Sequence, residues 1–415
     1  MFCFPSARWR GRRALATRWK RAIPTQASRC VDVTTHYFRQ RVVQSNGKIL
    51  QWHLHHHNEK AKDESVSLGA IVVVANAEVD LPRICRNASV LQGEAMPCME
   101  VAGRSITERI IDRYLAAGIG NISLLIEAPL LSGAQPPRVS SPQVSVQVIT
   151  DIRSAISETL SNYSSEGIEQ VFVHWADAYV ETDLLDLFYF HAAARQSVTC
   201  AYDREGSLPL WLVDCERGDR DNLATVVDRN PQASASYVIQ GYSRRFSEPR
   251  SLREFAVDIL EGRCESRPSG EEAKPGIWID AGAEIHRGAR VVAPAYIGRG
   301  SKIMDEALIT RSSSVETNCV IDCGTVVENS SILANTRVGI WLDVCRAVVN
   351  GSYLLSLARD VTVEIADTSL VRPLLARGRA KSAREWDRIQ DHVPSVGTSP
   401  ALPEAWGFGA NLLQD

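Results

Sequence analysis

Residues 279–333 read IDAGAEIHRGARVVAPAYIGRGSKIMDEALITRSSSVETNCVIDCGTVVENSSIL and decide the fold of the C-terminal third of the chain. An aliphatic residue occupies every sixth position: Ile279, Ile285, Val291, Ile297, Ile303, Ile309, Val315, Ile321, Val327 and Leu333. A small residue follows four positions after each aliphatic until Arg337 breaks the series. Neither the helical period of about 3.6 nor the strand period of about 2 produces this spacing. It predicts a triangular coil with three short strands per turn and aliphatic side chains along its axis.

The repeat resembles the hexapeptide left-handed β-helix, and we expect such a domain over 275–370. Its hand is implied by the resemblance, because the general rule for parallel crossovers predicts the opposite hand. Beyond Arg337 the spacing slips by one position, to Val338 and Val344. We expect residues 346–370 to close the open end of the coil. In the C-terminal tail, 371–415, we expect a basic piece that could be helical over 371–391, followed by a loosely ordered stretch.

The composition sets the class of protein. The chain has 415 residues, a net charge of −3 and a pI of about 6.3, which gives no general attraction to nucleic acids or membranes. No apolar run approaches the roughly 18 residues of a membrane span. Its 10 cysteines show no C-x-x-C pair. This usage favours thiols in a reduced, cytoplasmic setting.

Residues 1–65 differ in composition from the rest. Eight arginines and lysines precede the first acidic residue, Asp32, which is typical of a transit peptide or of a basic arm for anionic surfaces. We favour the alternative interpretation, in which these residues are a largely disordered extension or the start codon is placed too early. Four histidines between His53 and His57 could bind a metal adventitiously, but no acid or cysteine stands at ligand spacing.

Residues 66–265 alternate between strand and helix patterns. Strands are predicted at 70–75, 121–126, 144–149, 171–175 and 197–202, and helices at 105–117, from Asp151, and at 183–194. This order indicates a Rossmann-like α/β domain with a mostly parallel sheet. Ligands of such sheets bind at the carboxyl ends of the strands, here the loop after 70–75 and Asp177.

Two stretches carry a more specific resemblance. MPCMEVAGRSITERIIDRYLAAGI (96–119) and VFVHWADAYVETDLLDLFYFHAAA (171–194) resemble the sugar-1-phosphate nucleotidyltransferase family, whose mannose-1-phosphate guanylyltransferases also carry a C-terminal β-helix. The family joins a nucleoside triphosphate to a sugar 1-phosphate. The resemblance places Gly103, Arg104 and Glu108 on matching positions, Asp177 on the Mg²⁺-binding aspartate, and His191 on the following helix.

The phosphate-binding loop of that family departs from its pattern in this chain. Three phosphates need glycines for close backbone approach, and an arginine and a lysine for charge. The corresponding loop reads VANAEVDLPR (74–83), with Ala75 beside the substituted positions Asn76 and Glu78, and Asp80 in place of the arginine. No lysine occurs between Lys62 and Lys274. Arg83, Arg86 and Arg104 are the residues that could partly substitute.

A second metal ligand is expected late in the domain. In the family that this chain resembles, a W-x-D-x-G-T motif supplies this ligand, and GIWIDAG (276–282) is superficially similar to it. Asp280 follows the first aliphatic of the repeat, however, so we expect it to belong to the coil instead. Asp177 could have a structural role instead of binding a metal, because an aspartate after a buried strand often caps a turn. Mg²⁺ is expected only if the protein is active.

The sequence leaves three hypotheses. The favoured one is a degenerate relative that binds a nucleotide sugar or sugar phosphate, or regulates an active enzyme of polysaccharide synthesis. The second is a divergent but active enzyme similar to the mannose-1-phosphate guanylyltransferases. The third is a β-helix acyltransferase or structural oligomer, for which the outward-facing His286 is the one candidate base. In each case the coil could support a homo-oligomer or a hetero-partner.

Overall fold

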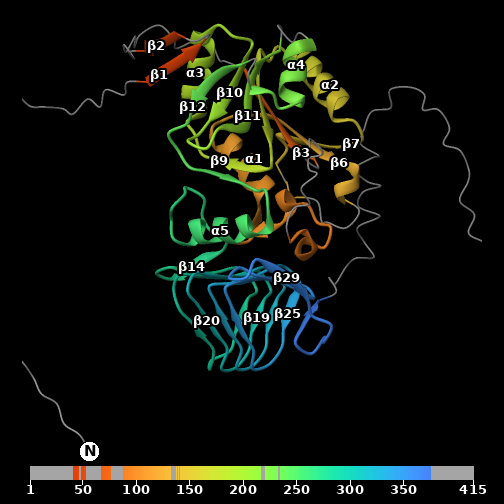
Figure 1. Cartoon of the computed structure of the whole chain (residues 1–415), viewed down its shortest axis with the longest axis vertical. Helices are drawn as coiled ribbons and strands as arrows, with labels where there is room; N and C mark the ends of the chain where they lie inside the picture. The colour runs from red at the N-terminus through yellow and green to blue at the C-terminus, as the bar shows by residue number, and fades with distance from the viewer. Residues whose placement is uncertain are drawn as a thin grey trace, which may run out of the picture.

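The computed structural model describes residues 41–45, 48–52, 67–75, 87–131, 137, 139, 141–215, 220–231 and 234–374. A seven-stranded sheet lies above a coil of short strands (Figure 1). The strands of the large sheet are β3 (Leu68–Val74), β6 (Asn121–Glu127), β7 (Val144–Ile149), β8 (Gln170–Trp175), β10 (Val198–Tyr202), β11 (Ser207–Asp214) and β12 (Ala235–Val238).

The large sheet confirms the predicted α/β class. Its order is β12-β10-β11-β8-β3-β6-β7, and β11 alone runs antiparallel to its neighbours. The chain leaves β3 for β6 on one side and returns to β8 on the other. The carboxyl ends of β3 and β8 therefore form the switch point of the sheet, where ligands of such folds bind.

Helices cover both faces of this sheet. They are α1 (Ile106–Ala116), α2 (Ile152–Ser165), α3 (Leu184–Ala194), α4 (Arg220–Val227) and α5 (Pro249–Leu260). The cores show that α1 and α3 pack on one face and α2 and α4 on the other, while α5 lies between the sheet and the coil (Figure 1). Helix α1 begins where the sequence predicts, because Ser105 and Glu108 form a capping box. Gly118, with φ of 84°, follows its last turn.

The C-terminal region is a coil of three mainly parallel sheets. One contains β14 (Glu271–Lys274), β15 (Ile277–Ile279), β18 (Ala295–Ile297), β21 (Ser313–Val315), β24 (Ser331–Ile332), β27 (Ala347–Asn350), β28 (Tyr353–Ser356) and β29 (Val361–Glu364). The second contains β16 (Glu284–Ile285), β19 (Lys302–Ile303), β22 (Val320–Ile321), β25 (Thr336–Val338) and β30 (Val371–Pro373). The third contains β17 (Arg290–Val291), β20 (Leu308–Thr310), β23 (Val326–Glu328) and β26 (Asp343–Cys345).

The register of the coil follows the six-residue spacing. Ala295 pairs with Ser313, three repeats later, and Ile303 pairs with Ile321. The aliphatic positions of the middle turns are fully buried along the axis, as the spacing predicts. Strand β28 then runs antiparallel to both of its neighbours, β27 and β29, at the end of the coil.

One position of the repeat was predicted wrongly. Ile332, not Leu333, faces the axis, because Val315 pairs with Ile332 and the turn after Val327 is one residue shorter. Asn329 stands in that turn with φ of 47°. The slip that the spacing places after Arg337 therefore occurs earlier, and Leu333 packs against the core of the α/β domain.

Smaller strands complete the described chain. They are β1 (Arg41–Ser45), β2 (Lys48–Trp52), β4 (Glu100–Val101), β5 (Arg104–Ser105), β9 (Ala178–Val180) and β13 (Ser243–Arg245), with short helices η1 (Ala88–Leu91), η2 (Met96–Cys98) and η3 (Ala128–Leu131). The β1–β2 hairpin falls in the stretch for which the sequence predicts a largely disordered extension; the remainder of 1–65 and residues 375–415 lie outside the described residues. Among the helices described, none is long and apolar enough to cross a membrane.

Candidate functional site

Asp177 lies at the switch point of the sheet, just beyond the end of β8. The backbone N–H of Ala176 donates to the carbonyl of Val73, so this turn lies against the end of β3. Ala75 ends the described part of the β3 loop. Asn76, Glu78, Asp80, Arg83 and Arg86 lie outside the described residues, so their predicted roles at this edge stay predictions.

The carboxylate of Asp177 is paired with Arg229. The guanidinium of Arg229 donates to Oδ2 of Asp177 and lies 4.1 Å from the centre of the Trp175 ring. A cation over an indole face is attracted by the ring's electron density, so Trp175 helps to hold Arg229 in place. Burial raises the pKa of Asp177, and Arg229 opposes that rise.

Arg229 reaches this position because α4 ends just before it. Its backbone is left-handed, with φ of 53°, as is common directly after a helix. Asp228, the preceding residue, pairs with Arg153 of α2 at 2.7 Å, so an exposed ion pair links the end of α4 to the neighbouring helix. No sequence motif identifies Arg229, since only the fold brings α4 next to the end of β8.

The described residues around Asp177 do not fit a Mg²⁺ ion. One carboxylate oxygen is already bonded to a guanidinium, and the described residues contain no group of three or more histidine, cysteine or acidic side chains that could hold a metal. Mg²⁺ needs six oxygen ligands in near-ideal octahedral geometry. A permanent cation at Asp177 repels a second one at the same oxygen.

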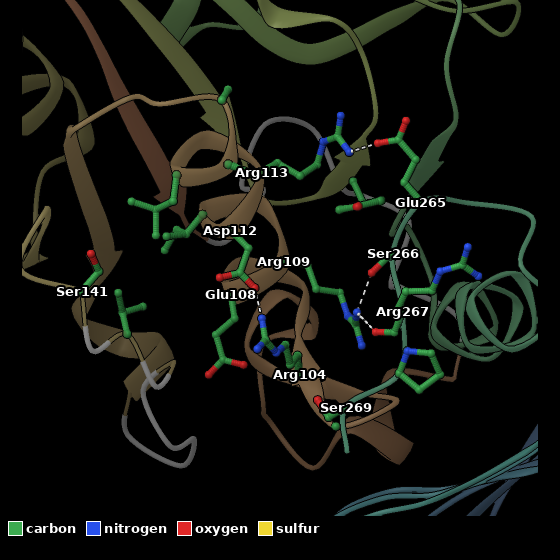
Figure 2. A pocket seen from close by; sticks show the side chains of 18 of the residues that line it. Arg104, Glu108, Arg109, Asp112, Arg113, Ser141, Glu265, Ser266, Arg267 and Ser269 are labelled. Atoms are coloured by element: carbon green, nitrogen blue, oxygen red, sulfur yellow. Dashed lines mark hydrogen bonds and ion pairs between the residues drawn. The ribbon is translucent and has the colours of Figure 1, made fainter. Parts of the chain in front are cut away.

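Arg104 and Asp280 lie elsewhere, at a cavity between the two domains (Figure 2). The cavity has a volume of about 1140 Å³ and runs along α1, facing residues 265–270 and the first turns of the coil. Asp177 does not line it. The structure therefore brings Arg104 and Asp280 to one cavity and separates both of them from Asp177.

Asp280 belongs to the coil, as expected from the repeat. Its backbone N–H donates to the carbonyl of Ile297 in the next turn. Its carboxylate accepts hydrogen bonds from the backbone N–H of Ala281 at 2.6 Å and from the hydroxyl of Tyr296 at 3.3 Å. Asp280 is thus engaged in holding the first turns of the coil together.

A buried carboxylate joins the coil to the loop before α1. The oxygens of Glu316 accept hydrogen bonds from the N–H groups of Ala102 at 3.0 Å and of Gly103 at 2.9 Å. Both of those residues have positive φ, 50° and 86°, so their adjacent N–H groups point to one anion. Burial raises the pKa of Glu316 to about 7, and Glu100 adds to the rise.

Two histidines were singled out from the sequence, His191 and His286, and each contacts side chains of its own domain. His191 is buried, with Nδ1 2.7 Å from Thr199 Oγ1 and Nε2 3.0 Å from Asp214 Oδ1, so it ties α3 to the sheet. His286 is exposed on the coil, with Nδ1 2.9 Å from Asp305. Neither of them lines the cavity between the domains.

The comparisons with known proteins add no family. No protein-family model matches this chain, and no curated protein matches it. The fold and the placement of these side chains therefore carry the functional argument.

Proposed function

We propose that this protein is a non-catalytic relative of the sugar-1-phosphate nucleotidyltransferases that binds a nucleotide sugar or a sugar phosphate. Such a protein acts alone or as the regulatory partner of an active enzyme of polysaccharide synthesis. One observation carries the proposal. Arg229 is paired with Asp177 at the switch point, the place where the family resemblance puts the metal-binding carboxylate.

The charges at this edge argue against nucleotidyl transfer. Attack on an α-phosphorus needs a metal or equivalent clamp that coordinates phosphate oxygens and neutralises the developing charge. Arg229 neutralises Asp177, but a guanidinium has only N–H donors and cannot offer open coordination positions. The absence of lysine from Lys62 to Lys274 removes the ammonium that the family uses. Binding needs less than catalysis, because a scaffold can hold a ligand without stabilising a transition state.

The remaining features fit a protein that works with partners. We infer that the coil is a left-handed β-helix, as its six-residue repeat and three-sheet register suggest. Its outer faces offer surface for a second copy or a hetero-partner, and we propose no nucleic acid or membrane ligand. A reducing, cytoplasmic setting suits the cysteines of the described residues, which form no disulfide.

Two measurements on the purified full chain test the proposal. Thermal unfolding with GDP-mannose, UDP-glucose and their parent sugar phosphates should show a higher Tm for at least one ligand. Pyrophosphate release with Mg²⁺, nucleoside triphosphates and sugar 1-phosphates should stay at the level of a protein-free blank. Release that disappears in Asp177→Ala would instead establish an active enzyme, and no shift with any of these compounds would remove the binding function.

A further inference from the structure

One edge of the large sheet is open. Strand β7 ends the sheet beyond β6, and within the described ranges no other strand pairs with it. At the opposite edge, β12 is contacted by β1 of the N-terminal hairpin (Figure 1). The backbone of an edge strand leaves alternate N–H and C=O groups unpaired, so an open edge can accept a further strand.

The backbone groups that face outward from β7 belong to its valines. The carbonyl of Gln143 accepts from the N–H of Ile122 in β6 at 3.1 Å. In a parallel ladder, alternate residues direct both backbone groups to the same neighbour, so the groups of Val146 and Val148 point away from β6. Each of these two valines therefore offers one donor and one acceptor at the open edge.

Strand β7 lacks the features by which edge strands usually avoid pairing. Those features are charged side chains, a proline within the strand, or a bulge that twists the edge away. Residues 139–150 carry no charge, β7 contains no proline, and its register with β6 is regular. Strand β14, at the edge of the largest sheet of the coil, differs, because it reads EEAK and all four of its residues are exposed. The chain thus protects β14 with charge and leaves β7 unprotected.

The side chains of β7 match an antiparallel copy of the same strand. Two copies related by a two-fold axis pair edge to edge only in the antiparallel direction. Residues 143–148 read QVSVQV, which is almost the same in both directions. With Val146 at the two-fold axis, Val144 lies opposite Val148 and Ser145 lies opposite Gln147. Valine then meets valine on one face, and neutral polar side chains meet on the other, without a like-charge pair.

Strand β29 shows that an exposed edge alone is not self-complementary. Its Val361 and Val363 are 49% and 50% exposed, similar to the 47% of Val148 in β7. However, Asp360 and Glu364 stand at the two ends of that valine pair. An antiparallel pairing of two β29 strands, centred between the valines, places the aspartate of one copy opposite the glutamate of the other. Like charges directly opposite each other destabilise such a pairing.

We propose that two copies of this chain associate through β7, which pairs antiparallel with the β7 of the other copy to form one continuous sheet. This inference goes beyond the proposed function and does not depend on it, because no ligand is involved. One strand from each copy gives a contact at the small end of specific interfaces. The dimer should therefore dissociate at micromolar concentrations of protein.

Sedimentation velocity of the full chain from about 1 μM to about 100 μM tests the contact. We expect the mass to rise with concentration from that of the 45.8 kDa chain toward twice that value. Gln147→Lys/Val148→Lys adds a lysine to each face of the edge and should raise the dimer Kd roughly tenfold or more. Val361→Lys/Val363→Lys adds the same charge to β29, at side chains of similar exposure, and should dimerise as the wild type does.

Hydrogen exchange of the wild type adds a measurement that needs no variant. The amides of Val146 and Val148 should exchange more slowly at the high concentration than at the low one, because pairing protects them. A chain that stays monomeric over the whole range overturns the proposal. So does an equal weakening by both lysine pairs, which reduces the effect to net charge, or a weakening by the β29 pair alone, which moves the contact to the coil. None of these results depends on whether a nucleotide sugar raises the Tm.

Discussion

The carboxylate of Glu316, in the coil, accepts a hydrogen bond from the backbone N–H of Gly103, in the loop before α1, over 2.9 Å. This contact crosses from one domain to the other and is buried. Removing a charged group from water costs free energy, and the two N–H donors compensate for only part of that cost. The joint between the domains therefore includes a carboxylate that protonates near neutral pH.

Glu316 should make stability depend on pH. Its pKa in the folded protein is about 7, above its ordinary value of 4.5. Its stabilising contribution is complete below pH 4.5 and is lost as the pH rises through 7. The difference between these two pKa values corresponds to about 3 kcal/mol of unfolding free energy. Urea unfolding of the wild type and Glu316→Gln at several pH values between 4.5 and 8 measures it.

The charged groups around Glu316 define the control for that experiment. Four other groups interact electrostatically at this interface: the carboxylates of Glu100 and Asp280, the hydroxyl of Tyr296 and the guanidinium of Arg109. They remain in the Glu316→Gln variant, so the difference between the two pH curves reports Glu316 itself. Parallel curves would show that this carboxylate does not titrate in the interval.

Gly103 should tolerate no side chain. An added Cβ would collide with the Tyr296 hydroxyl and lie 2.7 Å from Cβ of Ser269, and the φ of 86° is itself unfavourable for alanine. We expect Gly103→Ala to lower the unfolding free energy by about 2 kcal/mol or more. Gly93→Ala is the matched control, because Gly93 has φ of 81° with nothing within 4 Å. If both variants lose the same stability in urea unfolding, the collision contributes nothing.

Arg229 should stabilise the switch point through Asp177. Arg229→Ala leaves a partly buried carboxylate without its cation, which costs roughly 1–3 kcal/mol. A double-mutant cycle with Asp177→Asn, followed by chemical denaturation, should give a coupling energy of about 1 kcal/mol or more. A coupling near zero would mean that Asp177 and Arg229 are neighbours without mutual dependence.

The axis of the coil should behave as a packed core. Ile321 is fully buried there, so Ile321→Ala removes aliphatic volume from a site that cannot collapse easily and should cost about 2–5 kcal/mol. Ile340, 61% exposed on the same coil, supplies the control, and Ile340→Ala should change the unfolding free energy little. Equal effects of the two substitutions would refute the assignment of the repeat to the axis.

Much of the fold could be predicted from periodicity. The six-residue spacing identifies the coil residues, and Ser105, Glu108 and Asp151 mark the helix starts that the structure has. The antiparallel β11 and helices α4 and α5 were missed, although α5 carries an amphipathic pattern that opens with Pro249 and could have revealed it. The early slip at Ile332 was missed because Leu333 is equally aliphatic and fits the six-residue spacing.

The candidate sites were harder to predict than the fold. Asp177 was identified from its position after a strand, but Arg229 lies 52 residues away in sequence and no spacing links the two. Glu316 belongs to no motif either. Its contacts with Ala102 and Gly103 form only when the coil is placed against the loop before α1, and sequence periodicity does not specify that placement.

We propose that this scaffold binds its ligand without a divalent metal, because the guanidinium of Arg229 already compensates the carboxylate of Asp177. Isothermal titration of the wild type with GDP-mannose and UDP-glucose, once in EDTA and once in Mg²⁺, tests it most directly. We predict binding of at least one nucleotide sugar with the same Kd in both buffers. Affinity that appears only with Mg²⁺ and is lost in Asp177→Asn would contradict the claim.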